Sequence, residues 1–182
     1  MLSDDMDMVG ADVGPWARAS MLEGQRVCLE PLQVEHAGEM ALVLDDPDLH
    51  RFTGGSPATR AELAKTYSRQ VAGPADRSQR WLNWIVRRLA DDQAVGTVQA
   101  TIGRKEGRVV AEVAWIVGTA YQGHGYATEA AEVMVRWIRS QGDVRIVAHV
   151  HPDNTSSAYV ARAVGLSPTD VVADGEVRWL GG

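Results

Sequence analysis

Apolar residues recur at every second position over residues 108–117, and this alternation predicts a β-strand with one buried face. The residues on that face are Val109, Ala111, Val113, Trp115 and Val117. From Tyr126 onward, apolar residues instead recur at spacings of three and four, which predicts an amphipathic helix that ends at Gln141-Gly142. The chain is therefore expected to run from a strand through a short loop directly into a helix.

The remaining periodicity predicts an ordered chain from Arg26 onward, in which strands and helices are interspersed. Further strands are expected at 26–32, 81–89, 94–103 and 144–150, and further helices near 34–45, 59–72 and 154–164. Two terminal strands are expected on either side of Asp174-Gly175, a dipeptide typical of two-residue hairpins. This order predicts an α/β or α+β fold with a sheet of about six or seven strands.

The length of 182 residues fits one domain with a sizeable core. Residues 1–21 mix Asp, Gly and Pro around Trp16 without a sustained period, so we expect a flexible or loosely docked tail there and a single domain over residues 22–182. Cys28 is the only cysteine, which excludes an intrachain disulfide and a thiol-rich metal site. Its apolar neighbours in the first strand predict that it is buried.

Charge and hydropathy narrow the class of partner. Eighteen basic and 24 acidic residues give a net charge of −6, which disfavours nonspecific nucleic-acid binding and suits a cationic or amine-bearing substrate. No apolar run approaches the length of a membrane helix, and Asp4, Asp5 and Asp7 stand where a secretory signal would carry positive charge. We therefore expect a cytoplasmic protein with no nucleic-acid or membrane partner.

The loop between the strand and the helix reads Tyr121-Gln122-Gly123-His124-Gly125-Tyr126-Ala127-Thr128. Its two glycines allow the backbone to approach a ligand closely, and the unpaired N–H groups of the first helical turn then point at it. A phosphate or pyrophosphate fits this arrangement best, although a turn required only by the fold remains an alternative. The loop has neither the ending of a P-loop nor the three spaced glycines of a dinucleotide turn.

Two segments resemble the GNAT superfamily of acyl-CoA-dependent N-acetyltransferases. The first is Gln122-x-x-Gly125-x-Ala127, which is similar to the Gln/Arg-x-x-Gly-x-Gly/Ala signature. The second runs from His151 to Leu166 and resembles the Asn-x-x-Ser segment of the ribosomal-protein N-terminal acetyltransferase (RimJ/RimL-type) branch through Asn154 and Ser157. The resemblance covers about residues 25 to 180.

The resemblance implies a GNAT-like sheet, mixed but mostly antiparallel, with splayed central strands and about four flanking helices. It further implies that Trp115, Ile116 and Val117 hold the pantetheine arm of acetyl-CoA. The pyrophosphate would then bind the N–H groups of residues 122–128, namely Gln122, Gly123, His124, Gly125, Tyr126, Ala127 and Thr128. The Thr128 hydroxyl would be a further donor. A protonated His124 would approach a phosphate, with an exposed loop histidine as the alternative.

The chemistry requires a base, because an alkylammonium must lose a proton before it attacks a thioester. Glu112 is the candidate, since it is the only ionisable residue inside the apolar run 109–117, and desolvation is expected to raise its pKa. The alternative is a glutamate paired with an arginine or solvated at a strand edge. For the leaving thiolate, the resemblance points to Ser157, because Ala161 stands where many members carry a tyrosine. Tyr159 ranks lower and is expected to pack against the sheet.

Other residues near these segments have structural interpretations as well. Asn154 is expected to cap a helix by accepting from the Ser157 N–H, a role that is compatible with a pantetheine contact. His149 and His151 share a strand face at a spacing that suits a metal, but acyl transfer explains the segment without one, so we predict no metal site. For His149, a position on the acceptor side of the splayed sheet is the alternative. Trp81 and Trp84 fall on opposite strand faces, so one is expected in the core and the other near the acceptor.

The sequence therefore predicts an acetyl-CoA-dependent N-acetyltransferase that acts on a primary amine by direct transfer in a ternary complex. Cys28 gives no reason to expect a covalent enzyme intermediate, because it is far in sequence from both motifs. Two alternatives stay open: a non-catalytic acyl-CoA-binding module, and a transferase for a larger acyl group such as succinyl. The amine acceptor and the presence of a homodimer stay open as well.

Overall fold

The computed structural model describes residues 16–52, 54–75 and 78–182. Its strands form one sheet in the order β1-β2-β3-β4-β5-β6-β8-β7. Neighbouring strands pair antiparallel except β5 and β6, which run parallel. The strands are β1 Leu22–Glu23, β2 Val27–Pro31, β3 Arg80–Arg88, β4 Gln93–Lys105, β5 Arg108–Val117, β6 Arg145–Val150, β7 Ser167–Ala173 and β8 Glu176–Gly181. The expected mixed sheet is confirmed, and the two-residue β1 brings the strands of the described chain to eight.

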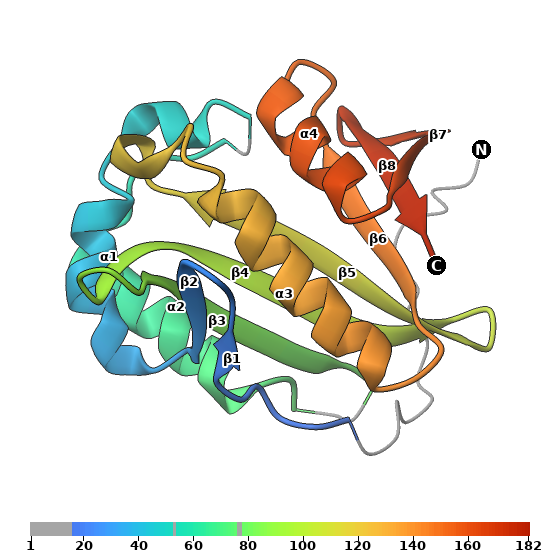
Figure 1. Ribbon diagram of the computed structural model, residues 1–182, viewed down its shortest axis with the longest axis horizontal. Helices are drawn as coiled ribbons and strands as arrows, with labels where there is room; N and C mark the ends of the chain where they lie inside the picture. The colour runs from blue at the N-terminus through green and yellow to red at the C-terminus, as the bar shows by residue number, and fades with distance from the viewer. Residues whose placement is uncertain (1–15, 53, 76–77) are drawn as a thin grey trace.

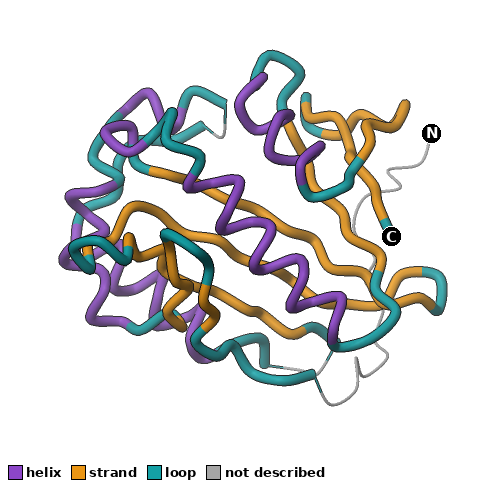
Figure 2. Tube along the Cα trace, viewed as in Figure 1, coloured by secondary structure: helices purple, strands orange, loops and turns teal. Residues whose placement is uncertain are grey.

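Four α-helices flank the sheet in the described residues, as expected. They are α1 Ala37–Val43, α2 Arg60–Ala72, α3 Tyr126–Ser140 and α4 Thr155–Ala163, with short 3-10 helices η1 Val34–His36, η2 Pro47–His50 and η3 Thr119–Tyr121. Figure 1 shows α3 crossing one face of the sheet, and Figure 2 shows α1 and α2 behind it. Alternation along β3 explains this arrangement, because Trp84 packs in the cluster under α3 while Ile85 packs with residues of α1 and α2.

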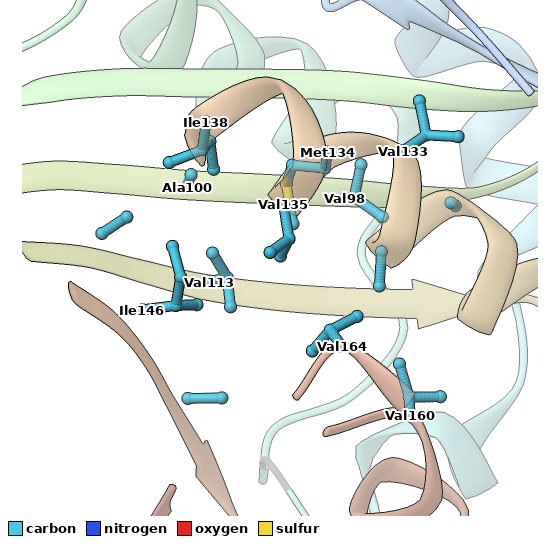
Figure 3. Packing of buried hydrophobic residues seen from close by; sticks show 14 of the residues in the cluster. Val98, Ala100, Val113, Val133, Met134, Val135, Ile138, Ile146, Val160 and Val164 are labelled. Atoms are coloured by element: carbon cyan, nitrogen blue, oxygen red, sulfur yellow. The ribbon is translucent and has the colours of Figure 1, made fainter. Parts of the chain in front are cut away.

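The larger core lies between α3 and the central strands. Met134 and Ile138 of α3 have no exposed surface, and they pack with residues of β4, β5 and β6 such as Ala100, Val113 and Ile146. In Figure 3 these side chains meet between the helix and the strands. This packing fixes α3, and therefore its N-terminal turn, relative to the end of β5.

The sheet opens between its two parallel strands. β5 and β6 pair over only three residues, Val110 with Arg145, Ala111 with Ile146 and Glu112 with Val147. Beyond Glu112, β5 continues to Val117 while pairing only with β4, and β6 continues to Val150 while pairing only with β8. The two strands diverge visibly in Figure 1, so the expected splay is present.

Two smaller expectations are wrong. Cys28 is half-buried rather than buried, because it lies on the opposite strand face from its fully buried neighbours Val27 and Leu29. Tyr159 does not pack against the sheet, since it is 67% exposed on α4.

Trp16 is partly buried against the main core, whereas residues 1–15 of the expected tail lie outside the described residues. The boundary between tail and domain stays a prediction.

Candidate active site

A cavity of about 1080 Å³ lies where β5 and β6 diverge. Its walls come from η2, β3, β4, the second half of β5, the loop into α3, β6, α4 and the start of β8. It therefore brings together the two sequence segments singled out above, which are about 30 residues apart in the chain. The predicted site residues that line it are Glu112, Trp115, Ile116, Val117, Gln122, Gly123, Gly125, Tyr126, Ala127, Thr128, Asn154 and Ser157.

The loop of residues 122–128, which we call the cradle, has the backbone geometry that an anion site needs. Gly123 and Gly125 adopt φ values of 77° and 79°, a left-handed conformation that favours glycine. The first bond of the helical pattern runs from the Glu129 N–H to the Gly125 carbonyl at 3.1 Å. The N–H groups of Tyr126, Ala127 and Thr128 precede that bond, and these residues line the cavity. The residues present thus fit a pyrophosphate at the positive end of α3.

His124 is the one predicted cofactor-binding residue that does not line the cavity. Its ring stacks on Tyr126 with centroids 5.7 Å apart, and its Nδ1 lies 2.9 Å from the Gln122 carbonyl oxygen. The His124 side chain therefore contacts the cradle from outside the cavity. Direct contact with a phosphate stays a prediction.

Arg26, which the sequence did not single out, joins β2 to the cradle. Its guanidinium donates to the His124 carbonyl at 2.9 Å and lies over the Tyr126 ring at 5.4 Å. Glu129 holds it through an ion pair of 2.9 Å and also accepts backbone N–H bonds from Gln25 and Arg26 at 2.7 and 2.6 Å. Burial opposes ionisation of Glu129, but these hydrogen bonds from Arg26 and its neighbours lower its pKa. The Arg26–Glu129 pair thus fixes the backbone of the cradle, and Arg26 itself is not among the residues that line the cavity.

Glu112 is paired with a histidine, which the sequence did not predict. Its Oε1 lies 3.0 Å from Nδ1 of His149, and both side chains line the cavity. The expected rise in the Glu112 pKa is wrong, because the hydrogen bond to His149 outweighs desolvation and lowers the pKa. The same hydrogen bond raises the pKa of His149. The pairing follows from the strand register, in which Glu112 lies opposite Val147, two residues before His149.

The N-terminus of α4 forms the opposite wall. The Asn154 side chain accepts from the Ser157 N–H at 3.0 Å, so the predicted cap is confirmed. Ala161, which stands where the resemblance would place a tyrosine, is fully buried and has no hydroxyl to offer. Ser156, Ser157 and Tyr159 all line the cavity, so three hydroxyl-bearing residues of α4 lie on this side of it.

The remaining wall combines aromatic and acidic side chains. Phe52 packs against His151 with ring centroids 5.1 Å apart, and the Trp81 indole donates to Gln79 at 3.1 Å. Trp84 is fully buried, so the two tryptophans divide between core and cavity as expected. The carboxylates of Asp48 and Glu176 also line this part, and no lysine or arginine is among the described residues that do so.

Neither a metal-binding cluster nor a membrane-spanning helix is present in the part of the chain that the structure describes. No group of three or more His, Cys, Asp or Glu side chains there is arranged to hold a metal ion. No helix of the same part of the chain has both the length and the apolar character needed to cross a bilayer.

The splayed mixed sheet and the glycine-containing turn before α3 are the features that the sequence resemblance implied. Residues 26–167 match the family model described as the acetyltransferase (GNAT) domain, and the chain belongs to that family. No curated protein matches the sequence.

Solved structures share this fold at low sequence identity. RimL, a ribosomal L7/L12 α-N-protein acetyltransferase solved with coenzyme A, is 14% identical with a TM-score of 0.71, over 89% of this chain and 97% of that one. A GCN5-related N-acetyltransferase from Brucella melitensis is 20% identical with a TM-score of 0.70, over 92% and 80%. The microcin C7 self-immunity acetyltransferase MccE, solved with acetyl-CoA and AMP, is 13% identical with a TM-score of 0.68, over 86% and 92%.

Proposed function

We propose that this acetyltransferase moves an acetyl group from acetyl-CoA to a primary amine by direct transfer in a ternary complex. One observation carries the proposal: a single cavity connects the cradle at the N-terminus of α3 with the Glu112–His149 pair on the sheet. An acyl donor anchored at one end and an amine deprotonated at the other would meet inside it. The N-terminal acetyltransferase (RimJ/RimL-type) branch is the proposed relationship, supported by Asn154 and Ser157 and by the fold that RimL shares.

The cofactor half of the site would be built from backbone. When bound, acetyl-CoA supplies an activated thioester carbonyl. The cradle N–H groups would hold its phosphates, while Trp115, Ile116 and Val117, unpaired on the β6 side, would offer backbone groups to the pantetheine. Asn154 and Ser157 would lie against the same arm, with the Ser157 hydroxyl or that of Tyr159 near the sulfur.

The acceptor half favours a cationic amine. Its described walls carry the carboxylates of Asp48, Glu112 and Glu176 together with the aromatic surfaces of Phe52 and Trp81. A protonated amine is attracted to such a surface and loses its charge on deprotonation. Both small amines and the amino terminus of a peptide meet these requirements.

The direct test measures CoA thiol release from acetyl-CoA across a panel of amines, peptides and aminoglycosides, with calorimetry of CoA binding in parallel. Acetylation of at least one amine and CoA binding are the expected results. Absence of both overturns the proposal. Binding without turnover for any acceptor points to the non-catalytic acyl-CoA module, and faster turnover with succinyl-CoA points to the larger acyl donor.

A matched control separates the site from general effects of substitution. Glu112→Gln replaces the carboxylate in the cavity, whereas Glu106→Gln makes the same change at the exposed turn between β4 and β5. The first is expected to lower turnover and the second to leave it unchanged. Equal activity of the two variants would mean that the Glu112 carboxylate has no part in the reaction.

A further inference from the structure

The strand register places His149 at the mouth of the opening in the sheet. The last paired residues of β5 and β6 are Glu112 and Val147, and side chains alternate along β6, so His149 follows Val147 on the same face. Trp81 and Thr101 extend that row across β3 and β4, because Trp81 pairs with Thr101 and Thr101 pairs with Glu112. His149 therefore lies on the acceptor face, one step beyond the point where the strands part.

The contact between the two side chains fixes how the imidazole is oriented. Nδ1 of His149 lies 3.0 Å from Oε1 of Glu112, and an ionised carboxylate accepts only, so Nδ1 carries the proton. In the neutral imidazole Nε2 is then the unprotonated nitrogen, and the only hydrogen bond of the ring within the described residues is the one at Nδ1. The His149 side chain is 29% exposed and lines the cavity, so this nitrogen has access to an acceptor.

We propose that Nε2 of His149 is the base that takes the proton from the acceptor ammonium, and that Glu112 is a positioning residue that holds the imidazole by its Nδ1–H. This inference rests on the proposed function and divides the Glu112–His149 pair into two roles. It reverses the simpler assignment in which Glu112 itself is the base.

The acid strengths of the two groups agree with this division. The hydrogen bond between them lowers the pKa of Glu112, which makes the carboxylate a weaker base, and raises the pKa of His149, which makes the neutral imidazole a stronger base. Glu112 also stabilises the imidazolium that forms, as a carboxylate partner of a catalytic histidine does.

The proton count balances without another reactant. R–NH3⁺ gives one proton to neutral His149, the freed lone pair forms the N–C bond to the acetyl carbon, and the C–S bond breaks. The second proton leaves the nitrogen as the amide forms and neutralises the departing thiolate. His149 then returns its proton to solvent, so the net products are the amide, free thiol and one H⁺.

Other charged groups around the pair modulate it. Glu176 and Arg178 of β8 both act on His149, Glu176 raising its pKa and Arg178, opposite it in the strand register, lowering it. Arg178 and Lys105 lower the pKa of Glu112. His151 follows directly after the end of β6, two residues beyond His149, and also lines the cavity. The hydrogen bond between Glu112 and His149 is the largest of these influences on both groups.

The proposal predicts how kcat/KM depends on pH. His149 is a base only when neutral, so kcat/KM should rise as pH increases through its raised pKa. Removing the Glu112 charge removes the main cause of that rise, so the acid limb of Glu112→Gln should move to lower pH. Its kcat should also fall roughly 10- to 100-fold, the usual effect of losing an outer partner of a working imidazole.

The experiment compares pH profiles of kcat/KM for the wild type, Glu112→Gln, His149→Gln and the control Glu106→Gln, with CoA affinity as the folding check. We expect His149→Gln to lose about 10²–10⁴-fold in kcat together with the acid limb, while CoA binding is retained. Activity of His149→Gln within threefold of the wild type, or an acid limb that stays in place in Glu112→Gln, overturns the proposal.

A second measurement keeps this test separate from that of the proposed function. NMR titration of the His149 imidazole is expected to give a lower pKa in Glu112→Gln than in the wild type, and an unchanged value overturns the pairing even without an acceptor. A wild type that acetylates no amine defeats the proposed function instead. A wild type that turns over with His149 dispensable defeats only the inference.

Discussion

Glu129→Ala should destabilise the protein by releasing the start of β2 from the cradle. The Glu129 carboxylate accepts from the backbone N–H groups of Gln25 at 2.7 Å, Arg26 at 2.6 Å and Val27 at 3.3 Å, and it pairs with the Arg26 guanidinium. Four donors on one neighbouring segment thus converge on a side chain that is only 14% exposed. Glu132, the other carboxylate of α3, has no such contact with the described residues.

The magnitude follows from how easily water replaces each bond. A hydrogen bond to a charged group contributes about 1.5–3 kcal/mol when its donor stays buried, but Gln25 and Arg26 are exposed, so about 1 kcal/mol each is expected for the two short bonds. The ion pair adds about 0–1 kcal/mol because the Arg26 side chain is 54% exposed. The variant should therefore lose roughly 2–3 kcal/mol of unfolding free energy.

Thermal and urea denaturation measure this loss. About 2–3 kcal/mol corresponds to a Tm lowered by roughly 5–10 °C in a protein of this size. Glu132→Ala, one turn further along α3 and exposed, is the matched control and should change stability by less than about 0.5 kcal/mol. If both variants unfold together with the wild type, the reasoning about these four bonds is refuted.

The pH dependence gives an independent check. The Glu129 pKa is lowered in the folded state, so its stabilisation is complete above the pKa of the unfolded chain and is lost as pH falls through the folded pKa. The stability difference between the wild type and Glu129→Ala should therefore narrow in acid. A constant difference would mean that packing rather than charge holds the segment.

Three further substitutions probe the site and its support. Gly125→Ala places a methyl group 3.3 Å from the Arg26 guanidinium at a φ of 79°, so urea denaturation should show a loss of about 1–2 kcal/mol of unfolding free energy. CoA binding measured by calorimetry should weaken as well, and unchanged CoA affinity would contradict the proposal that the cradle binds the cofactor. Asn154→Ala should lose about 1 kcal/mol of helix capping by thermal denaturation, whereas Asn154→Ser keeps the cap, and equal stability of both variants would refute the capping role. Reduced CoA affinity in Asn154→Ser, whose cap is intact, would identify a cofactor contact of the amide. Met134→Ala removes a fully buried side chain and should cost about 2–5 kcal/mol, measured by urea denaturation, with CoA affinity retained by the folded protein; a cost under about 1 kcal/mol would mean that the core collapses around the gap.

Much of the fold could be predicted because its elements follow simple periods. The alternation in residues 108–117 and the three-and-four spacing after Tyr126 gave a strand and a helix whose bounds the structure reproduces. The two-residue β1 could not be found, since so short a strand carries no period and exists only through its pairing with Leu29 and Cys28. Burial of single residues was harder to predict, and Cys28 shows why, because its exposure depends on which strand face meets α3.

The candidate site could likewise be predicted only in part. The cradle could be predicted because its glycines and its place before a helix are local features of the sequence. The partner of Glu112 could not, because it depends on the register between two strands that are 37 positions apart at the contact. Arg26 is further still from the cradle in the sequence, and only the packing of β2 beside α3 brings them together. Electrostatic expectations fail most readily when such long-range neighbours are unknown, as the direction of the Glu112 pKa shows.

The opening between β5 and β6 also divides the molecule mechanically. Strands β1–β5 form one hydrogen-bonded unit, and β6, β8 and β7 form another. The two units are joined by the three residue pairs between β5 and β6 and by contacts of α3. Local unfolding should therefore separate these units before either melts. A molecule that bonds to both edges of the opening would couple them into a single cooperative unit. Amide hydrogen exchange in the second half of β6 should then slow sharply when the cofactor binds, even at residues that it does not touch.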